Sequence, residues 1–193
     1  MVVSLLLRLN IYWENLYIEK PLTFWEFVQK QTNLKKLYFP VENALKTYHR
    51  LAQNPLINAP LTEIYATGPT GIGKGVYCNL IIAYKIYLTL LLKEPKKLFD
   101  FSKSAHLDCV FICQYKGFAK NFVSFISSIQ GENPIFKFNT LSGEGMLIQE
   151  DEDNNYYIKY KDNEIVLRSG SSEYDLLGTN PVIVYLNCNG FEL

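Results

Sequence analysis

The sequence predicts an α/β fold in which helices flank a parallel sheet. A glycine-rich turn at 68–75 separates a short strand-like segment, 61–67, from a long apolar helix at 76–92. A second strand followed by a helix is predicted at 108–129. Residues 181–186 (PVIVYL) form a continuous apolar run rich in β-branched side chains, which is typical of a strand buried within a parallel sheet. Strands and helices that alternate in this way place helices on the faces of such a sheet.

The composition restricts the function classes. Lys+Arg and Asp+Glu each total 19 in 193 residues, so the net charge is zero and any contact with nucleic acid requires a local basic patch. The four cysteines and two histidines lack the spacing of metal ligands, which predicts no metal site and a reducing compartment. The longest apolar stretch, 80–92, contains Lys85 and is shorter than the ~18–20 residues that a membrane span needs, so we expect no membrane contact.

Two regions are predicted along the chain. Residues 1–60 form a helical leader: Thr23 and Glu26 have the spacing of a capping box at a helix start, and a second helix is expected at 40–50. Residues 61–193 form the core domain. Three strand-like runs interrupt its strand–helix alternation, and the turn-rich sequences between them predict a β-hairpin insertion; these runs are 146–149, 156–160 and 164–169.

The glycine-rich turn matches the pattern G-x-x-x-x-G-K of a phosphate-binding loop. Glycines at this spacing let successive backbone N–H groups point inward as an anion-binding nest, and the helix that follows adds its positive N-terminal end. A lysine at the end of the pattern reaches the β- and γ-phosphates. We therefore predict an NTPase-type phosphate-loop fold with ATP as the cofactor, bound by Gly68, Pro69, Thr70, Gly71, Ile72, Gly73, Lys74 and Gly75.

Two positions linked to magnesium depart from this pattern. Gly75 stands where a Ser or Thr hydroxyl normally ligates Mg²⁺. At the end of the last apolar strand, Asn187 and Cys188 stand where an acidic pair is expected to hold the metal and polarise the attacking water. The sequence therefore predicts phosphate binding but puts Mg²⁺ placement, and with it ATP hydrolysis, in doubt.

Four segments of the chain resemble the ATPase part of the large terminase subunit of tailed phages, the motor that packages DNA. They span the leader helix, the phosphate loop with its helix, the next strand and helix, and a Gly-Ser-Ser-Glu run that precedes the last strand; their residues are 21–50, 63–102, 109–123 and 165–191. In this comparison Gly170, Ser171 and Ser172 match the family's run before its acidic strand. Asn187 and Cys188 occupy the metal-binding and catalytic acid positions without matching them.

The resemblance implies a motor that couples ATP hydrolysis to translocation of duplex DNA. It also implies an adenine-side region within residues 1–60, a homo-oligomeric ring on the capsid portal, and a location in the host cytoplasm at the capsid. The family continues beyond its acidic strand, so the resemblance implies a core sheet that is incomplete at its C-terminal end, with an exposed edge at 181–186.

Several alternatives stay open at the level of sequence. The chain is either an active motor subunit or, because of Gly75, Asn187 and Cys188, a non-catalytic nucleotide-binding or scaffold subunit on the same fold. A small-metabolite kinase is a third option, although no arginine-rich lid segment is present. Arg168 is the nearest candidate by chain order for a charge-stabilising arginine. Tyr38 and Phe39 are candidates for stacking on adenine, with a packing role as the alternative. Lys93, Lys96 and Lys97 are candidates for DNA contact, with a solvated helix end as the alternative.

Overall fold

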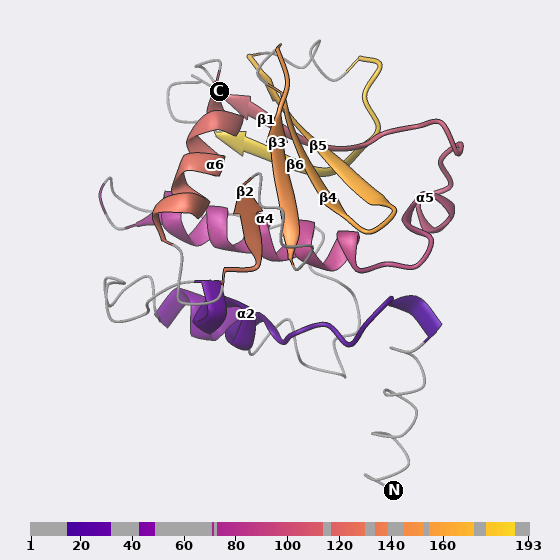
Figure 1. The fold of residues 1–193 in the computed structure, drawn as a ribbon. Coiled ribbons are helices and arrows are strands. Elements are labelled where there is room, and N and C mark those ends of the chain that lie inside the picture. Colours follow the sequence, from indigo (N-terminus) through magenta and orange to yellow (C-terminus); the bar gives the residue numbers. More distant parts are fainter. Residues whose placement is uncertain are drawn as a thin grey trace, which may run out of the picture.

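A mixed six-stranded sheet with helices packed against one face forms the framework of the molecule (Figure 1). The structure is a computed structural model. It describes residues 15–31, 43–48, 71, 73–113, 117–129, 134–138, 145–152, 155–171 and 177–187. The predicted strand at 61–67 and half of the phosphate loop lie outside this part of the chain. The division at residue 60 stays a prediction.

The sheet has the strand order β2-β3-β4-β5-β1-β6. Its centre is β1 (Leu107–Cys113), which pairs in parallel with β5 (Asn163–Gly170) on one side and with β6 (Pro181–Asn187) on the other. Every residue of β1 is buried, as its run of apolar and β-branched residues predicts. The remaining strands are β2 (Phe136–Phe138), β3 (Met146–Glu150) and β4 (Tyr156–Tyr160).

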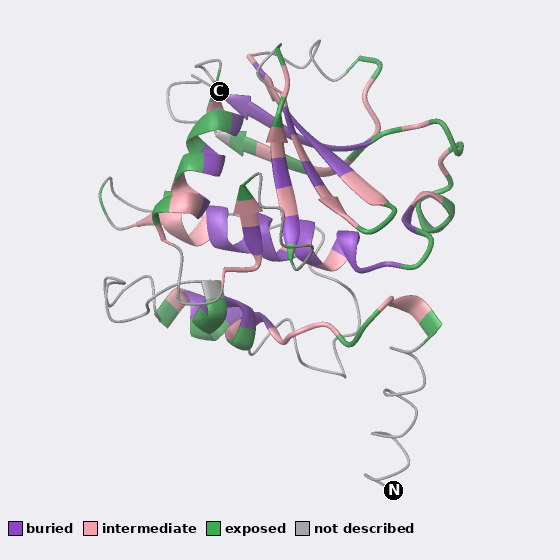
Figure 2. Ribbon diagram, in the orientation of Figure 1, coloured by how far each residue is buried: buried purple, intermediate pink, exposed green. Residues whose placement is uncertain are grey.

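Helix α4 (Lys74–Leu90) lies between the sheet and the N-terminal helix α2 (Phe24–Gln31) (Figure 1). It is apolar on almost every face, a pattern that indicates a helix enclosed by other elements. Helix α6 (Phe118–Ser128) is amphipathic: Ala119, Phe122, Val123 and Ile126 are buried, while its other side is largely exposed (Figure 2). A short helix, α5 (Pro95–Leu98), follows α4.

The N-terminal region packs against α4 through aromatic side chains. The predicted capping box begins α2: the Thr23 N–H donates to Glu26 Oε2 (2.8 Å) and the Glu26 N–H donates to Thr23 Oγ1 (3.2 Å). The rings of Phe24 and Phe27 lie 5.1 Å and 5.3 Å from the ring of Tyr84. Residues 43–48 are helical, within the helix predicted at 40–50. Because these side chains are fully or almost fully buried, α2 and α4 share one hydrophobic core.

The sheet differs from the sequence prediction in how β5 is used. β3 and β4 form the predicted antiparallel hairpin, and β5 pairs antiparallel with β4. The other edge of β5 pairs in parallel with β1, so the strand belongs to the parallel core as well as to the insertion. The hairpin therefore extends the main sheet. β2 and α5 were not predicted from the sequence, and both are very short.

Among the described residues, β6 forms one edge of the sheet. Tyr185 faces the helices, where its ring lies 5.1 Å from that of Phe118. Val184 and Leu186 point to the opposite face and are 47% and 60% exposed. An edge that carries exposed apolar side chains is a site at which other strands can pair. The incomplete sheet expected at 181–186 stays a prediction.

Candidate functional site

The carboxyl ends of the three parallel strands meet at one edge of the sheet. Asn187, the last residue of β6, pairs with Cys113 at the end of β1, and Gly170 at the end of β5 pairs with Ile112. The arrowheads of β1 and β6 and the first turn of α4 lie on the same side of the molecule, at the left in Figure 1. Ligands of open α/β sheets bind at this edge.

The start of α4 has the backbone geometry of an anion-binding loop. Gly71 and Gly73 have φ angles of 86° and 87°, in the left-handed region that glycine adopts without strain. Gly73 is the N-cap of α4, no side chain caps the helix, and no acidic residue lies in its first turn. The first N–H groups of α4 are therefore not neutralised by a capping side chain, and the helix dipole favours an anion there.

Helix α6 begins in a similar way but is capped. Its N-cap, Gly117, has a φ of 95°, and the Ala119 N–H donates a 2.8 Å hydrogen bond to Ser169 Oγ from β5. A side chain of the sheet thus occupies the N-terminus of α6. At the start of α4, by contrast, the N-cap Gly73 provides no capping side chain.

Within the first two turns of α4, the charged residue is Lys74. Lys74 is the first residue of the helix and is half-buried. Burial raises the pKa of the neighbouring Tyr77 hydroxyl, and it also raises the pKa of the Cys78 thiol. Both groups are therefore neutral near pH 7, so the first two turns present one positive charge to an incoming phosphate.

The absence of a hydroxyl at position 75 is not a steric necessity. Gly75 is the second residue of α4, and a Cβ placed there would meet no heavy atom within 4 Å. The structure therefore has room for a Cβ at this position. Steric crowding at this position therefore does not explain why Gly75 lacks the hydroxyl that normally ligates Mg²⁺.

The structure places only some of the predicted site residues. Gly71, Gly73, Lys74 and Gly75 are described at the start of α4, and Asn187 ends β6. Gly170 ends β5 and Ser171 follows it, so the described part of the Gly-Ser-Ser-Glu run lies at the same sheet edge. The other candidates lie outside the described residues. They are the loop residues Gly68, Pro69, Thr70 and Ile72, then Ser172 of the sheet-edge run, Cys188 at the acid position, and the adenine-stacking candidates Tyr38 and Phe39.

Arg168 holds strands together through a buried carboxylate. Its Nε donates a 2.8 Å hydrogen bond to Asp108 Oδ1, and the second oxygen of Asp108 accepts from the Asn180 N–H at 2.8 Å. Asp108 is 1% exposed. The carboxylate thus joins β1, β5 and the residue before β6, which gives Arg168 a structural contact that its chain position did not reveal.

The lysines around α5 have partners within that region. Lys97 Nζ lies 3.1 Å from Glu94 Oε2 in an exposed ion pair, and Lys96 Nζ donates to the Lys103 carbonyl oxygen at 2.8 Å. The hollow beside α5 is lined by four acidic side chains as well as by lysines; the acidic residues are Glu94, Asp100, Asp162 and Glu164. Charges of both signs favour the interpretation of a solvated helix end over a strongly basic patch.

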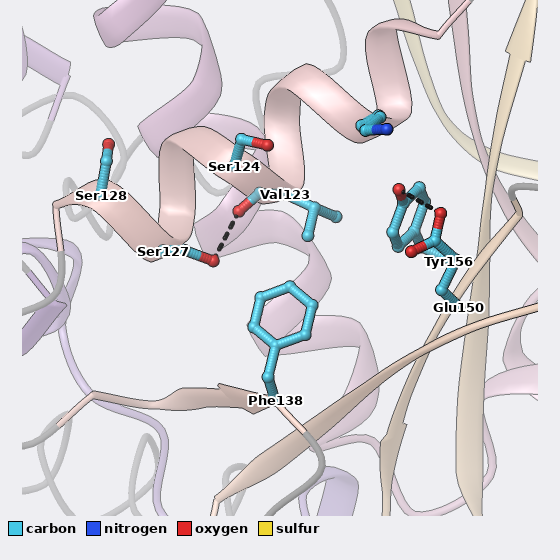
Figure 3. Close-up of a pocket in the computed structure, with 8 residues that line it drawn as sticks. Val123, Ser124, Ser127, Ser128, Phe138, Glu150 and Tyr156 are labelled. Atoms are coloured by element: carbon cyan, nitrogen blue, oxygen red, sulfur yellow. Dashed lines mark hydrogen bonds between the residues drawn. The ribbon is translucent and has the colours of Figure 1, made fainter.

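A separate groove of about 510 Å³ lies between α6 and strands β2 to β4 (Figure 3). Val123 and Phe138 provide its apolar surface, and the Tyr156 hydroxyl donates to Glu150 Oε1 at 2.7 Å. Burial raises the pKa of Tyr156 to about 12, with a further contribution from Glu150. None of the lining residues belongs to the predicted phosphate loop or to the acid position.

One polar side chain in α4 escaped the sequence analysis. Asn79 is 9% exposed, and its Oδ1 has no hydrogen-bond partner within the described structure. The available signal was its position, because Asn79 lies one turn after Gly75 on an otherwise apolar row of the helix. Among the described residues, no cluster of three or more His, Cys, Asp or Glu side chains is arranged to hold a metal.

Comparison with known proteins assigns the fold family. No curated protein and no solved structure matches the chain, and no helix in the described ranges is both long and apolar enough to cross a membrane. A family model of a P-loop domain matches residues 3–189, almost the whole chain. By that match the chain belongs to the family described as "Uncharacterized protein MJ0330, N-terminal P-loop domain".

Proposed function

We propose that this domain binds ATP through the phosphate loop at 68–75. The observation that carries the proposal is the start of α4, where two glycines with left-handed backbone precede a 17-residue helix without a side-chain cap. Backbone N–H groups at such a turn, together with the positive end of the helix, attract phosphate oxygens. Lys74 adds the charge that the β- and γ-phosphates require.

Calorimetric titration with ATP in the presence of EDTA tests this proposal without involving a metal. We expect saturable binding to the unmodified chain and at least a tenfold loss of affinity in Lys74→Ala. Lys93→Ala is the matched control, because it removes an exposed lysine just beyond the other end of α4. Equal binding by Lys74→Ala and the unmodified chain would contradict the proposal.

The role that we propose for bound ATP is to drive a motor of the DNA-packaging type. Support comes from the resemblance of four segments to large terminase subunits and from the position of Gly170 and Ser171. These residues end and follow a core strand, β5, at the sheet edge where Asn187 ends β6. The family described above fits this proposal at the coarser level of a P-loop domain.

DNA-stimulated ATP turnover tests the motor. We expect phosphate release that duplex DNA accelerates and that Lys74→Ala abolishes. Turnover at the background rate, with ATP binding intact, would reject the motor for this chain. That outcome would favour the non-catalytic alternative, which is supported by Gly75 and by Asn187 at the end of β6.

The non-catalytic alternative has its own test. The variant Gly75→Ser, Asn187→Asp, Cys188→Glu restores the expected magnesium-linked side chains, and the structure has room for a side chain at 75. If the original residues caused the loss of hydrolysis, turnover should rise in this variant. A variant that binds ATP unchanged and stays inert would place the cause of inactivity elsewhere.

A further inference from the structure

We infer that Asn79 supplies the polar oxygen that Gly75 lacks, as an acceptor for the magnesium ion, or for a water bound to it, that accompanies ATP. The inference rests on the proposed ATP-binding function. Asn79 lies outside the phosphate-loop pattern, and the observation behind the inference is its buried oxygen atom, which has no hydrogen-bond partner in the described structure. It provides the domain with one oxygen for the metal despite the glycine at 75.

The first step of the argument is the cost of Asn79 in its surroundings. Residues 79, 83, 86 and 90 form one row of α4, and the other three, Ala83, Ile86 and Leu90, are at most 1% exposed. Within the described structure the Oδ1 atom of Asn79 is buried and accepts no hydrogen bond. An unsatisfied buried acceptor costs about 1–3 kcal/mol, and a leucine would avoid this cost. Such an atom calls for an explanation, of which a bound ion or ligand is one.

The second step is the direction of the side chain. Side chains of an α-helix tilt toward its N-terminus, so the Asn79 side chain covers the preceding turn. The residue four positions earlier on the same row is Gly75, and positions i and i+4 lie about 5–6 Å apart at Cβ. Asn79 therefore lies one turn after the place where the missing hydroxyl would stand, although none of its side-chain atoms is within 4 Å of a Cβ at position 75.

The third step is the space at Gly75. A Cβ at this position would meet no heavy atom within 4 Å, so the turn above Asn79 is open. Because residue 75 has no side chain, a change in the side-chain torsion angles of Asn79 can bring the amide oxygen toward this space. An amide oxygen is a suitable ligand for Mg²⁺ and a good acceptor for a metal-bound water.

The experiment is a calorimetric comparison of ATP affinity with Mg²⁺ and with EDTA. We expect Mg²⁺ to raise the ATP affinity of the unmodified chain several-fold and Asn79→Ala to lose most of this increase while keeping its Mg²⁺-free affinity. Gly75→Ser should restore the increase in the Asn79→Ala background, because the hydroxyl then replaces the amide. Thr89→Ala is the control, since Thr89 is a similarly buried polar residue near the other end of α4 and its hydroxyl donates to the Lys85 carbonyl oxygen of the same helix.

The outcomes separate this inference from the proposed function. The role of Asn79 would be overturned if Mg²⁺ raised the ATP affinity of Asn79→Ala as much as that of the unmodified chain. It would also be overturned if Mg²⁺ did not raise the ATP affinity of the unmodified chain. In both cases, ATP binding without Mg²⁺ would still support the phosphate loop. Loss of Mg²⁺-free binding in Asn79→Ala with an unchanged melting temperature would also overturn the role of Asn79, because the amide would then act on the nucleotide itself. Asn79→Asp provides a second variant that keeps the length of the side chain and an oxygen acceptor; it should retain the increase, and full loss would count against an oxygen ligand.

Discussion

Gly73 and Gly75, at the start of α4, differ in whether the backbone requires glycine. Gly73 has a φ of 87°, where a Cβ is strained, whereas Gly75 has a helical position and open space around it. We expect Gly73→Ala to weaken ATP binding more than tenfold, because the first N–H groups of α4 would be reoriented. Gly75→Ala should stabilise the fold by about 0.5–1 kcal/mol, as alanine replaces glycine in a helix.

Urea unfolding and ATP titration of both variants provide the measurement. The pair is matched, because each variant adds one methyl group to the same turn. A Gly73→Ala variant with full affinity and stability would show that the left-handed backbone at this residue is not required.

The ion pair between buried Asp108 and Arg168 provides a second test at the scale of residues. It joins residues that are far apart in the sequence, so it was not predictable from the neighbours of Asp108. Asp108→Asn removes the charge next to Arg168 and should lower the free energy of unfolding by about 1–3 kcal/mol. Glu94→Gln is the control: its ion pair with Lys97 is exposed on both sides, so the expected change is below about 1 kcal/mol. Equal effects of the two substitutions in urea unfolding would contradict the structural role of Asp108.

At the scale of elements, two tyrosine hydroxyl groups fasten α4 to the segment that leads into α2. The Leu22 N–H donates to the Tyr87 hydroxyl oxygen at 2.9 Å, and the Tyr84 hydroxyl donates to the Leu22 carbonyl oxygen at 3.1 Å. Each bond contributes about 0.5–1.5 kcal/mol to stability. The double variant Tyr84→Phe, Tyr87→Phe should therefore lose about 1–3 kcal/mol and expose α2 to faster hydrogen exchange. Tyr157→Phe is the control, because its hydroxyl bonds Asp151 within the hairpin and not the segment that leads into α2.

The same tyrosines predict a pH dependence. Burial raises the pKa of Tyr87 to about 12, from the usual value of 10, and it also raises the pKa of Tyr84. The protonated phenol is favoured in the folded state, so this contribution to stability is complete below pH 10 and falls as the pH rises toward 12. Urea unfolding between pH 8 and 11.5 should show stability declining above pH 10, with a smaller decline in the double phenylalanine variant. A flat profile would contradict the burial of these hydroxyl groups.

The elements also show what the sequence could and could not predict. Periodicity and capping predicted α2, α4 and α6 to within a few residues, because these are local properties. The parallel pairing of β5 with β1 joins residues more than fifty positions apart, and nothing within the run 164–169 indicates it. For the site, the glycine spacing predicted the loop, whereas the burial of Asn79 Oδ1 depends on what packs around α4 and appears only in the folded chain.

At the scale of the whole molecule, helices cover one face of the sheet within the described structure, and β6 is an edge. Val184 and Leu186 expose apolar side chains at this edge, so we expect concentration-dependent self-association. Val184→Lys with Leu186→Lys should reduce association in sedimentation velocity and leave the melting temperature within a few degrees. Leu98→Lys, at an exposed position on α5, is the control. Association unchanged by the edge substitutions would show that this strand is not the contact surface.

Amide hydrogen exchange of the chain with and without ATP tests directly whether the phosphate loop binds the nucleotide. We predict slower exchange in a peptide that spans residues 68–77, because phosphate oxygens accept hydrogen bonds from those N–H groups. We predict little change at residues 117–121, where Ser169 already caps α6. No ATP-dependent protection at 68–77, or equal protection at both helix starts, would contradict nucleotide binding at the phosphate loop.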